Sequence, residues 1–89
     1  MNRWVLHCYT TYEERQHAMN VLKRERVNGK YVSLDDHGVY HQHLVIRDMT
    51  DAAQVRGMVY EQIHGIDNVP GELRDFVASR LRARKVAEE

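Results

Sequence analysis

The chain has 89 residues, 43% of them hydrophobic and 29% charged, and its thirteen basic residues balance its thirteen acidic ones. This length predicts one domain, over residues 1–89, with a single modest core, and the composition excludes a disordered chain. The zero formal charge argues against a protein that coats DNA, for which a strong positive excess is expected. Cys8 is the single cysteine, which excludes an intrachain disulfide and a zinc site built from several cysteines.

Neither a membrane span nor a leader peptide is expected. No stretch approaches the ~20 apolar residues that cross a bilayer, and the apolar run at the amino terminus is too short for a signal peptide. A lone thiol is compatible with a reducing compartment. We therefore expect a soluble cytoplasmic protein that does not act at a membrane.

The first elements are predicted to be a strand and a helix. Residues 4–9 are apolar and aromatic enough for a strand. Thr11 and Glu14 then match a capping box, in which each residue satisfies an amide at the start of a helix. The helix should run to about Arg26, and the Asn-Gly pair that follows should end it.

A β-hairpin is expected next. Residues 31–35 alternate between apolar and polar side chains, as a half-buried strand does. Residues 35–38 have a tight-turn sequence, Asp-Asp-His-Gly, and residues 38–47 form the most strand-like run of the chain. The two strands should therefore pair in an antiparallel manner.

The second half predicts two helices around a weak strand. Thr50 should cap a helix whose buried stripe is Ala52, Val55, Val59 and Ile63. Only residues 66–69 are then available for a fourth strand, so that strand should be short or absent. Residues 70–86 follow as a third helix, with Pro70 in its first turn and apolar side chains at helical spacing: Leu73, Phe76, Val77 and Leu81.

The order strand, helix, strand, strand, helix is that of the first five elements of the ferredoxin-like, split βαβ arrangement. We predict an α+β domain of this type, with a short or absent fourth strand and an extra C-terminal helix. In this arrangement the first and third strands are central neighbours and the helices cover one face of the sheet.

Side-chain alternation then sorts the strand residues into two faces. The more apolar set should face the helices, with Gln42 as its one misfit: Trp4, Leu6, Cys8, Val32, Leu34, Leu44 and Ile46. The other face should be exposed, and it collects His7, Tyr9, Tyr31, Ser33, His41 and His43. This mixed histidine and tyrosine surface is the candidate binding surface, with His7, Tyr9, Tyr31, His41 and His43 as its binding residues.

Two chemistries are open to that surface, and a third kind of binding is open to the edge of the sheet. His7, His41 and His43 could present three imidazoles to a metal ion, but no acidic residue stands beside them in the sequence, so we expect no metal or other cofactor. Tyr9 and Tyr31 could stack the bases of RNA or of another single strand. A short fourth strand would leave a sheet edge open to a protein partner.

An enzyme is not expected. Cys8 should point away from His7, its neighbour on the same strand, and the glycines are scattered rather than grouped in a phosphate-binding loop. The preferred interpretation is a small non-catalytic binding or regulatory module that associates with a protein, or with itself as a homodimer, through an exposed sheet face or an open strand edge. Nucleic-acid binding is the alternative, and a histidine-based metal or enzymatic site in a dimer is the second alternative.

Overall fold

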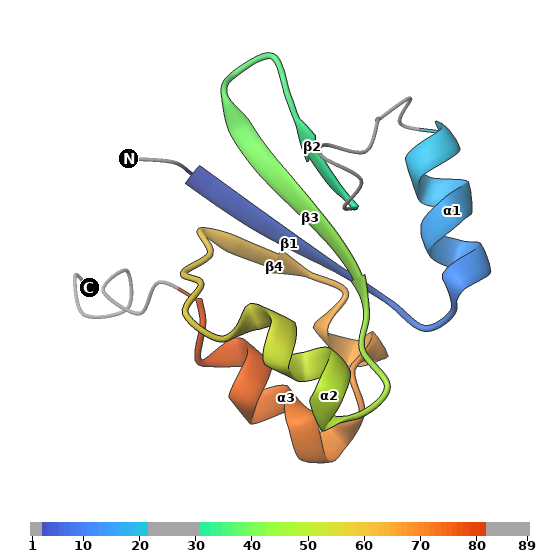
Figure 1. Cartoon of the computed structure of the whole chain (residues 1–89), viewed down its shortest axis with the longest axis vertical. Helices are drawn as coiled ribbons and strands as arrows, with labels where there is room; N and C mark the ends of the chain where they lie inside the picture. Colours follow the sequence, from blue (N-terminus) through green and yellow to red (C-terminus); the bar gives the residue numbers. More distant parts are fainter. Residues whose placement is uncertain (1–2, 22–30, 82–89) are drawn as a thin grey trace.

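The computed structural model describes residues 3–21 and 31–81 (Figure 1). These residues form a mixed α+β fold with a four-stranded sheet and three α-helices. In chain order the elements are β1 (Arg3–Tyr9), α1 (Tyr12–Val21), β2 (Val32–Leu34), β3 (Val39–Val45), α2 (Met49–Ala52), β4 (Gln62–His64) and α3 (Gly71–Ala78), with 3₁₀ turns at Ala53–Val55 and Ile66–Asn68. Within the described ranges, no helix combines the length and apolar character needed to cross a bilayer.

The strands lie in the order β2-β3-β1-β4. The two central strands, β1 and β3, are parallel, with His7 opposite His43, and β4 is parallel to β1 on its other side. Only β2 runs antiparallel, paired to β3. The segment from β3 through α2 to β4 therefore joins two parallel strands on either side of β1.

The ferredoxin-like topology is not confirmed, although the α+β class is. In that topology the first helix joins parallel strands, so the first and third strands run in opposite directions. Here β1 and β3 run in the same direction, and α1 joins two strands that are antiparallel. The order of elements along the chain is compatible with both arrangements, because it does not specify strand direction.

The start of α1 is set by its own residues, as predicted. The amide of Glu14 donates to Thr11 Oγ1 at 3.1 Å, and Glu14 Oε1 accepts from the amide of Thr10 at 3.1 Å. The first bond satisfies an amide of the first helical turn, whereas the return bond from Glu14 reaches the amide of Thr10, one residue before the cap Thr11. The predicted end of this helix near Arg26 lies outside the described residues.

The predicted β2–β3 hairpin is confirmed. The Asp35 carboxylate accepts from the amides of His37 (2.8 Å) and Val39 (3.0 Å), which closes the turn. Gly38 has a φ of 80°, a left-handed conformation that glycine adopts without strain. The strand β2 is shorter than predicted and covers only Val32–Leu34.

The predicted second helix is mostly wrong. Its cap is Asp48, whose side chain accepts from the amide of Asp51, and not Thr50. The helix α2 ends at Ala52, and the 3₁₀ turn that follows reaches only Val55. Gly57 then has a φ of 82°, which is incompatible with a continuing right-handed helix.

The fourth strand forms from residues that were assigned to that helix. Ile63 lies in β4 rather than on a helical stripe, and Val59 is 54% exposed. Residues 66–69, the predicted strand, instead contain a 3₁₀ turn. Tertiary pairing with β1 overrides the helical spacing of the apolar side chains in this segment.

The predicted third helix is confirmed as α3, which buries Leu73 and Val77, but it begins at Gly71, and Pro70 is its cap residue rather than part of its first turn. It ends at Ala78, and Leu81 is paired with Tyr60 in an isolated parallel bridge. The rest of the predicted helix, residues 82–86, lies outside the described part of the chain.

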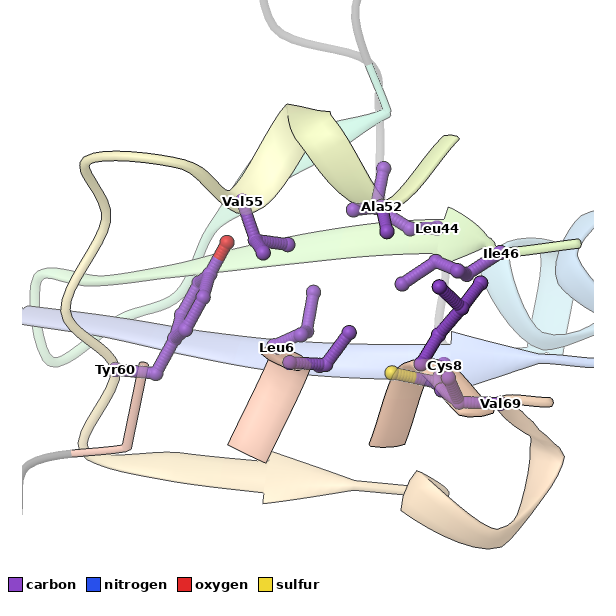
Figure 2. Close-up of a cluster of buried hydrophobic side chains, with 10 residues drawn as sticks. Leu6, Cys8, Leu44, Ile46, Ala52, Val55, Tyr60 and Val69 are labelled. Carbon is purple, nitrogen blue, oxygen red and sulfur yellow. The ribbon is translucent and has the colours of Figure 1, made fainter. Parts of the chain in front are cut away.

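The main core lies between one face of the sheet and the helices α2 and α3. Figure 2 shows side chains of β1, β3 and α2 meeting there with Tyr60 and Val69. Its buried members are Leu6, Cys8, Leu44, Ile46, Ala52, Val55, Tyr60, Val69, Leu73 and Val77. The predicted misfit on this face, Gln42, is accommodated because its Oε1 accepts a hydrogen bond from the hydroxyl of the buried Tyr60.

The opposite face is not the exposed surface that the sequence predicted. The Arg15 guanidinium of α1 lies 3.5 Å above the ring of Tyr31, which pairs with His43 on this face. His43 is 0% exposed and Ser33 is 3% exposed. The helix α1 therefore packs on the histidine face, and α2 and α3 pack on the other one.

Candidate functional site

The three histidines that the sequence placed on one face do lie together. His7 occupies the centre, with ring centroids 4.8 Å from His43 and 5.1 Å from His41. The rings of His7 and His43 are nearly parallel, with an interplanar angle of 11°. His64 of β4 stacks on His7 from the other side at 5.1 Å. We refer to His7, His41, His43 and His64 as the histidine stack.

Two of these rings form a hydrogen-bonded chain with a carboxylate. His41 Nε2 lies 2.9 Å from Asp35 Oδ2, and His41 Nδ1 lies 2.9 Å from His7 Nε2. The bond from His41, followed by the amide of Val39, lowers the pKa of the Asp35 carboxyl well below its usual range. Asp35 is therefore a carboxylate at neutral pH, and His41 Nε2 must carry the hydrogen that it donates.

His43 is held by a second set of bonds at the base of the stack. Its Nδ1 lies 2.9 Å from the hydroxyl of Tyr9, and its Nε2 lies 3.5 Å from Ser33 Oγ. A neutral imidazole satisfies both contacts, since it accepts at Nδ1 and donates at Nε2. The buried position of His43 is thus explained by partners on β1 and β2.

Two members of this site were missed by the sequence analysis. His64 was assigned to a helix and lies in β4, so only the strand pairing could have placed it. Asp35 lies across the hairpin turn from the histidines and is not beside them in the sequence. Once Ser33 is paired with His41, however, alternation places Asp35, the first residue after β2, on the same face as Ser33, and the hairpin register contained this signal.

The arrangement does not resemble a metal centre. Among residues 3–21 and 31–81, no group of three or more His, Cys, Asp or Glu side chains is placed to hold a metal ion. The rings of His7, His41 and His43 lie beside one another, and a nitrogen of His7 faces a nitrogen of His41. The sequence hypothesis that these three histidines could be ligands therefore gains no support from the geometry.

The two tyrosines proposed for base stacking contact the protein itself. The Tyr9 hydroxyl bonds to His43, and the Tyr31 ring lies under the Arg15 guanidinium at 3.5 Å. The same guanidinium lies 5.1 Å from the centre of the Tyr12 ring. A base could stack on that side of Tyr31 only after the Arg15 side chain moved away from the ring.

A second surface lies on the other face of the sheet, at the β2 edge. Leu34, Tyr40 and Trp4 are register partners in one row across β2, β3 and β1. The Tyr40 and Trp4 rings stack with centroids 4.8 Å apart, and Leu34 is 54% exposed. The helices α2 and α3 lie together towards β4, while β2 is at the opposite edge of the sheet (Figure 1). We call these three residues the edge row; the sequence analysis had placed Trp4 and Leu34 under helices.

The buried cysteine has no nucleophilic character. Cys8 is 3% exposed and belongs to the main core. Burial raises the pKa of its thiol to about 12, so the thiol stays protonated at neutral pH.

No protein-family model matches the chain, and neither a curated protein nor a solved structure is significantly similar to it. The histidine stack and the edge row are thus the features from which a function is inferred.

Proposed function

We propose that this chain is a small non-catalytic binding module that acts by protein–protein association through the β2 edge and the edge row. One observation carries the proposal: Leu34 exposes apolar surface at the sheet edge, and both Leu34 and Val32 direct backbone groups outward there. A strand edge with both properties is a site for pairing with another strand.

The outward direction of those backbone groups follows from the hairpin register. The amide of His43 donates to the carbonyl of Tyr31 at 2.8 Å, and the amide of Asp35 donates to the carbonyl of Val39 at 3.0 Å. Bonding groups alternate in direction along a strand, so Val32 and Leu34 direct theirs away from β3. No other strand of the described residues pairs with this side of β2.

The partner that fits this edge is a second copy of the chain. A two-fold axis through Ser33 would place Val32 opposite Leu34 of the other copy, and each such pair would exchange two backbone hydrogen bonds. The two edge rows would then continue across a single sheet. The zero formal charge of the chain means that two copies do not repel each other through net charge.

The cost of disrupting this surface can be worked from the exposure of Leu34. Burying the exposed 54% of one leucine side chain contributes about 1 kcal/mol, hence about 2 kcal/mol for the two copies in a dimer. Leu34→Lys should therefore weaken self-association about 30-fold or more. Val59→Lys is the matched control, because Val59 is equally exposed and precedes β4 at the opposite edge of the sheet.

Sedimentation velocity over a range of protein concentrations measures this directly. We expect a monomer–dimer equilibrium for the wild type and for Val59→Lys, and a shift towards monomer for Leu34→Lys. A wild-type protein that stays monomeric at high concentration, or a Leu34→Lys variant that dimerises normally, would contradict the proposal.

Nucleic-acid binding is the alternative, and a fluorescent single-stranded RNA titrated into the same samples tests it. Binding that is lost in Tyr9→Ala and Tyr31→Ala would support that alternative in place of association. A cytoplasmic location and the absence of a cofactor stay predictions from the sequence.

A further inference from the structure

The side chains of the edge row stand next to one another on the sheet. Trp4 and Tyr40 are register partners on the neighbouring strands β1 and β3, and Leu34 is the partner of Tyr40 on β2. The Trp4 and Tyr40 ring centroids lie 4.8 Å apart, with an interplanar angle of 18°. Neighbouring strands are also about 4.8 Å apart, so the two rings rise from the sheet side by side. Both rings are partly exposed, and Leu34 is 54% exposed.

The polar groups of the row are hydrogen-bond donors. The indole N–H of Trp4 can only donate, and the Tyr40 hydroxyl carries one O–H. Among residues 3–21 and 31–81, neither group has a hydrogen-bond partner, and neither is one of the buried unsatisfied atoms. Leu34 adds apolar surface beside them. A ligand that suits the row therefore combines apolar bulk with carbonyl acceptors.

The edge row consists of uncharged side chains. Arg3, which precedes Trp4 in β1, forms an ion pair with Glu61 at 3.1 Å. An RNA strand is bound mainly through cations that contact its phosphates. A neutral peptide therefore matches this row better than a nucleic acid does.

A proline-rich peptide has the matching chemistry. In the polyproline II conformation the backbone makes no internal hydrogen bonds, so its carbonyls are free to accept, and proline has no N–H that would need an acceptor. One turn of this helix is three residues long and spans about 9 Å. Leu34 and Trp4 lie two strands apart, which is also about 9 to 10 Å. Two prolines one turn apart therefore fit on either side of Tyr40.

We propose that the edge row is a docking site for a proline-rich segment of a partner protein. The rings of Trp4 and Tyr40 contact the prolines, and their N–H and O–H groups donate to carbonyls of the segment. The helices α2 and α3 leave the row open because they lie towards β4 (Figure 1). This inference goes beyond the association proposed above, since a second copy paired at the β2 edge extends the sheet beside Leu34 and does not cover the Trp4–Tyr40 pair.

The fluorescence of Trp4 tests the docking site directly, because Trp4 is the one tryptophan of the chain. The probe is a peptide of ten prolines, and a Gly-Ser peptide of the same length is the control because it has no preformed helix. We expect the Trp4 emission to shift to shorter wavelength as the proline peptide displaces water from the ring. The shift should saturate with a dissociation constant below about 1 mM, and the Gly-Ser peptide should not produce it.

Two variants separate the ring of Tyr40 from its hydroxyl. Tyr40→Ala removes both and should weaken binding about tenfold or more. Tyr40→Phe keeps the ring and should weaken binding about 3- to 10-fold through the loss of one hydrogen bond, and it serves if the alanine variant does not fold. Tyr12→Ala is the matched control, because Tyr12 is an exposed tyrosine on α1, which packs on the opposite face of the sheet. This control should bind like the wild type.

Four results would overturn the docking site. The first is the absence of a saturable change in Trp4 emission at up to about 5 mM proline peptide. The second is an equal response to the two peptides, and the third is a pair of Tyr40 variants that bind like the wild type. The fourth is a saturable response to single-stranded RNA in place of the proline peptide, which would assign the row to base stacking. Sedimentation without peptide measures the proposed self-association, so the failure of either proposal is observed separately.

Discussion

The hydrogen bond between Tyr60 and Gln42 gives the sharpest test of this fold. Gln42 lies on the core face of the central strand β3, opposite Leu6, and the Tyr60 hydroxyl donates to its side-chain oxygen. Tyr60 is fully buried, and this burial is the main cause that raises the pKa of its phenol above the ordinary value. The hydroxyl therefore stays protonated and available as a donor.

Removing either partner should leave the other unsatisfied. Tyr60→Phe deprives the Gln42 carbonyl of its donor, and Gln42→Leu leaves a buried hydroxyl without an acceptor. Each change should lower the free energy of unfolding by about 2 kcal/mol, which corresponds to roughly 10 °C in Tm for a chain of this size. The double variant replaces both polar groups by apolar ones and should be close to the wild type, so the coupling energy of the cycle should be about 4 kcal/mol.

Urea unfolding followed by circular dichroism measures all four proteins of this cycle. Single variants that each cost less than about 0.5 kcal/mol would show that the bond is not formed in a buried environment. Additive costs in the double variant would show that the two side chains do not interact, and would refute the register that places Gln42 beneath Tyr60.

Three further outcomes are expected. Burial raises the pKa of the Cys8 thiol to about 12, so Cys8 should react with a disulfide reagent only as fast as the protein unfolds. Because the thiol pKa is higher in the folded protein than in the unfolded chain, the contribution of Cys8 to stability should be lost as the pH rises above about 8.5. Urea unfolding at a series of alkaline pH values measures this loss. Asp48→Ala should cost about 1 kcal/mol in urea unfolding by removing the α2 cap, whereas Thr50→Ala should cost much less; equal costs would contradict the observed cap. Gly65→Ala should lower Tm far more than Gly57→Ala. Both glycines have a positive φ, but only at Gly65 would an added Cβ clash with another atom, the carbonyl oxygen of Cys8. Equal shifts in Tm would contradict this packing.

Interactions that span only a few residues could be predicted from the sequence. The Thr11–Glu14 capping box and the turn closed by Asp35 form as expected because the partners are neighbours along the chain. Alternation along the strands likewise determined that His7, His41 and His43 share a face, since successive side chains of a strand point in opposite directions.

Non-local pairing decided what local pattern could not. Val55, Val59 and Ile63 have the spacing of a helical stripe, yet Gly57 interrupts the helix and Ile63 joins a strand beside Leu6. A helix in this segment would leave the backbone groups along the free edge of β1 unpaired, whereas the strand β4 pairs with them. This gain in pairing depends on the position of β1, far away in the sequence, so the spacing of apolar residues does not reveal it.

The sequence by itself determined which side chains share each face of the sheet, and only the tertiary structure decided what covers those faces. Because β1 and β3 are parallel and α1 returns on the histidine face, His43 is buried there and Leu34 stays exposed on the other face, the reverse of what was predicted. Alternation depends on the backbone geometry of a single strand, whereas the cover of a face depends on strand direction and helix packing. Both of these are set by contacts between segments that are distant in the chain.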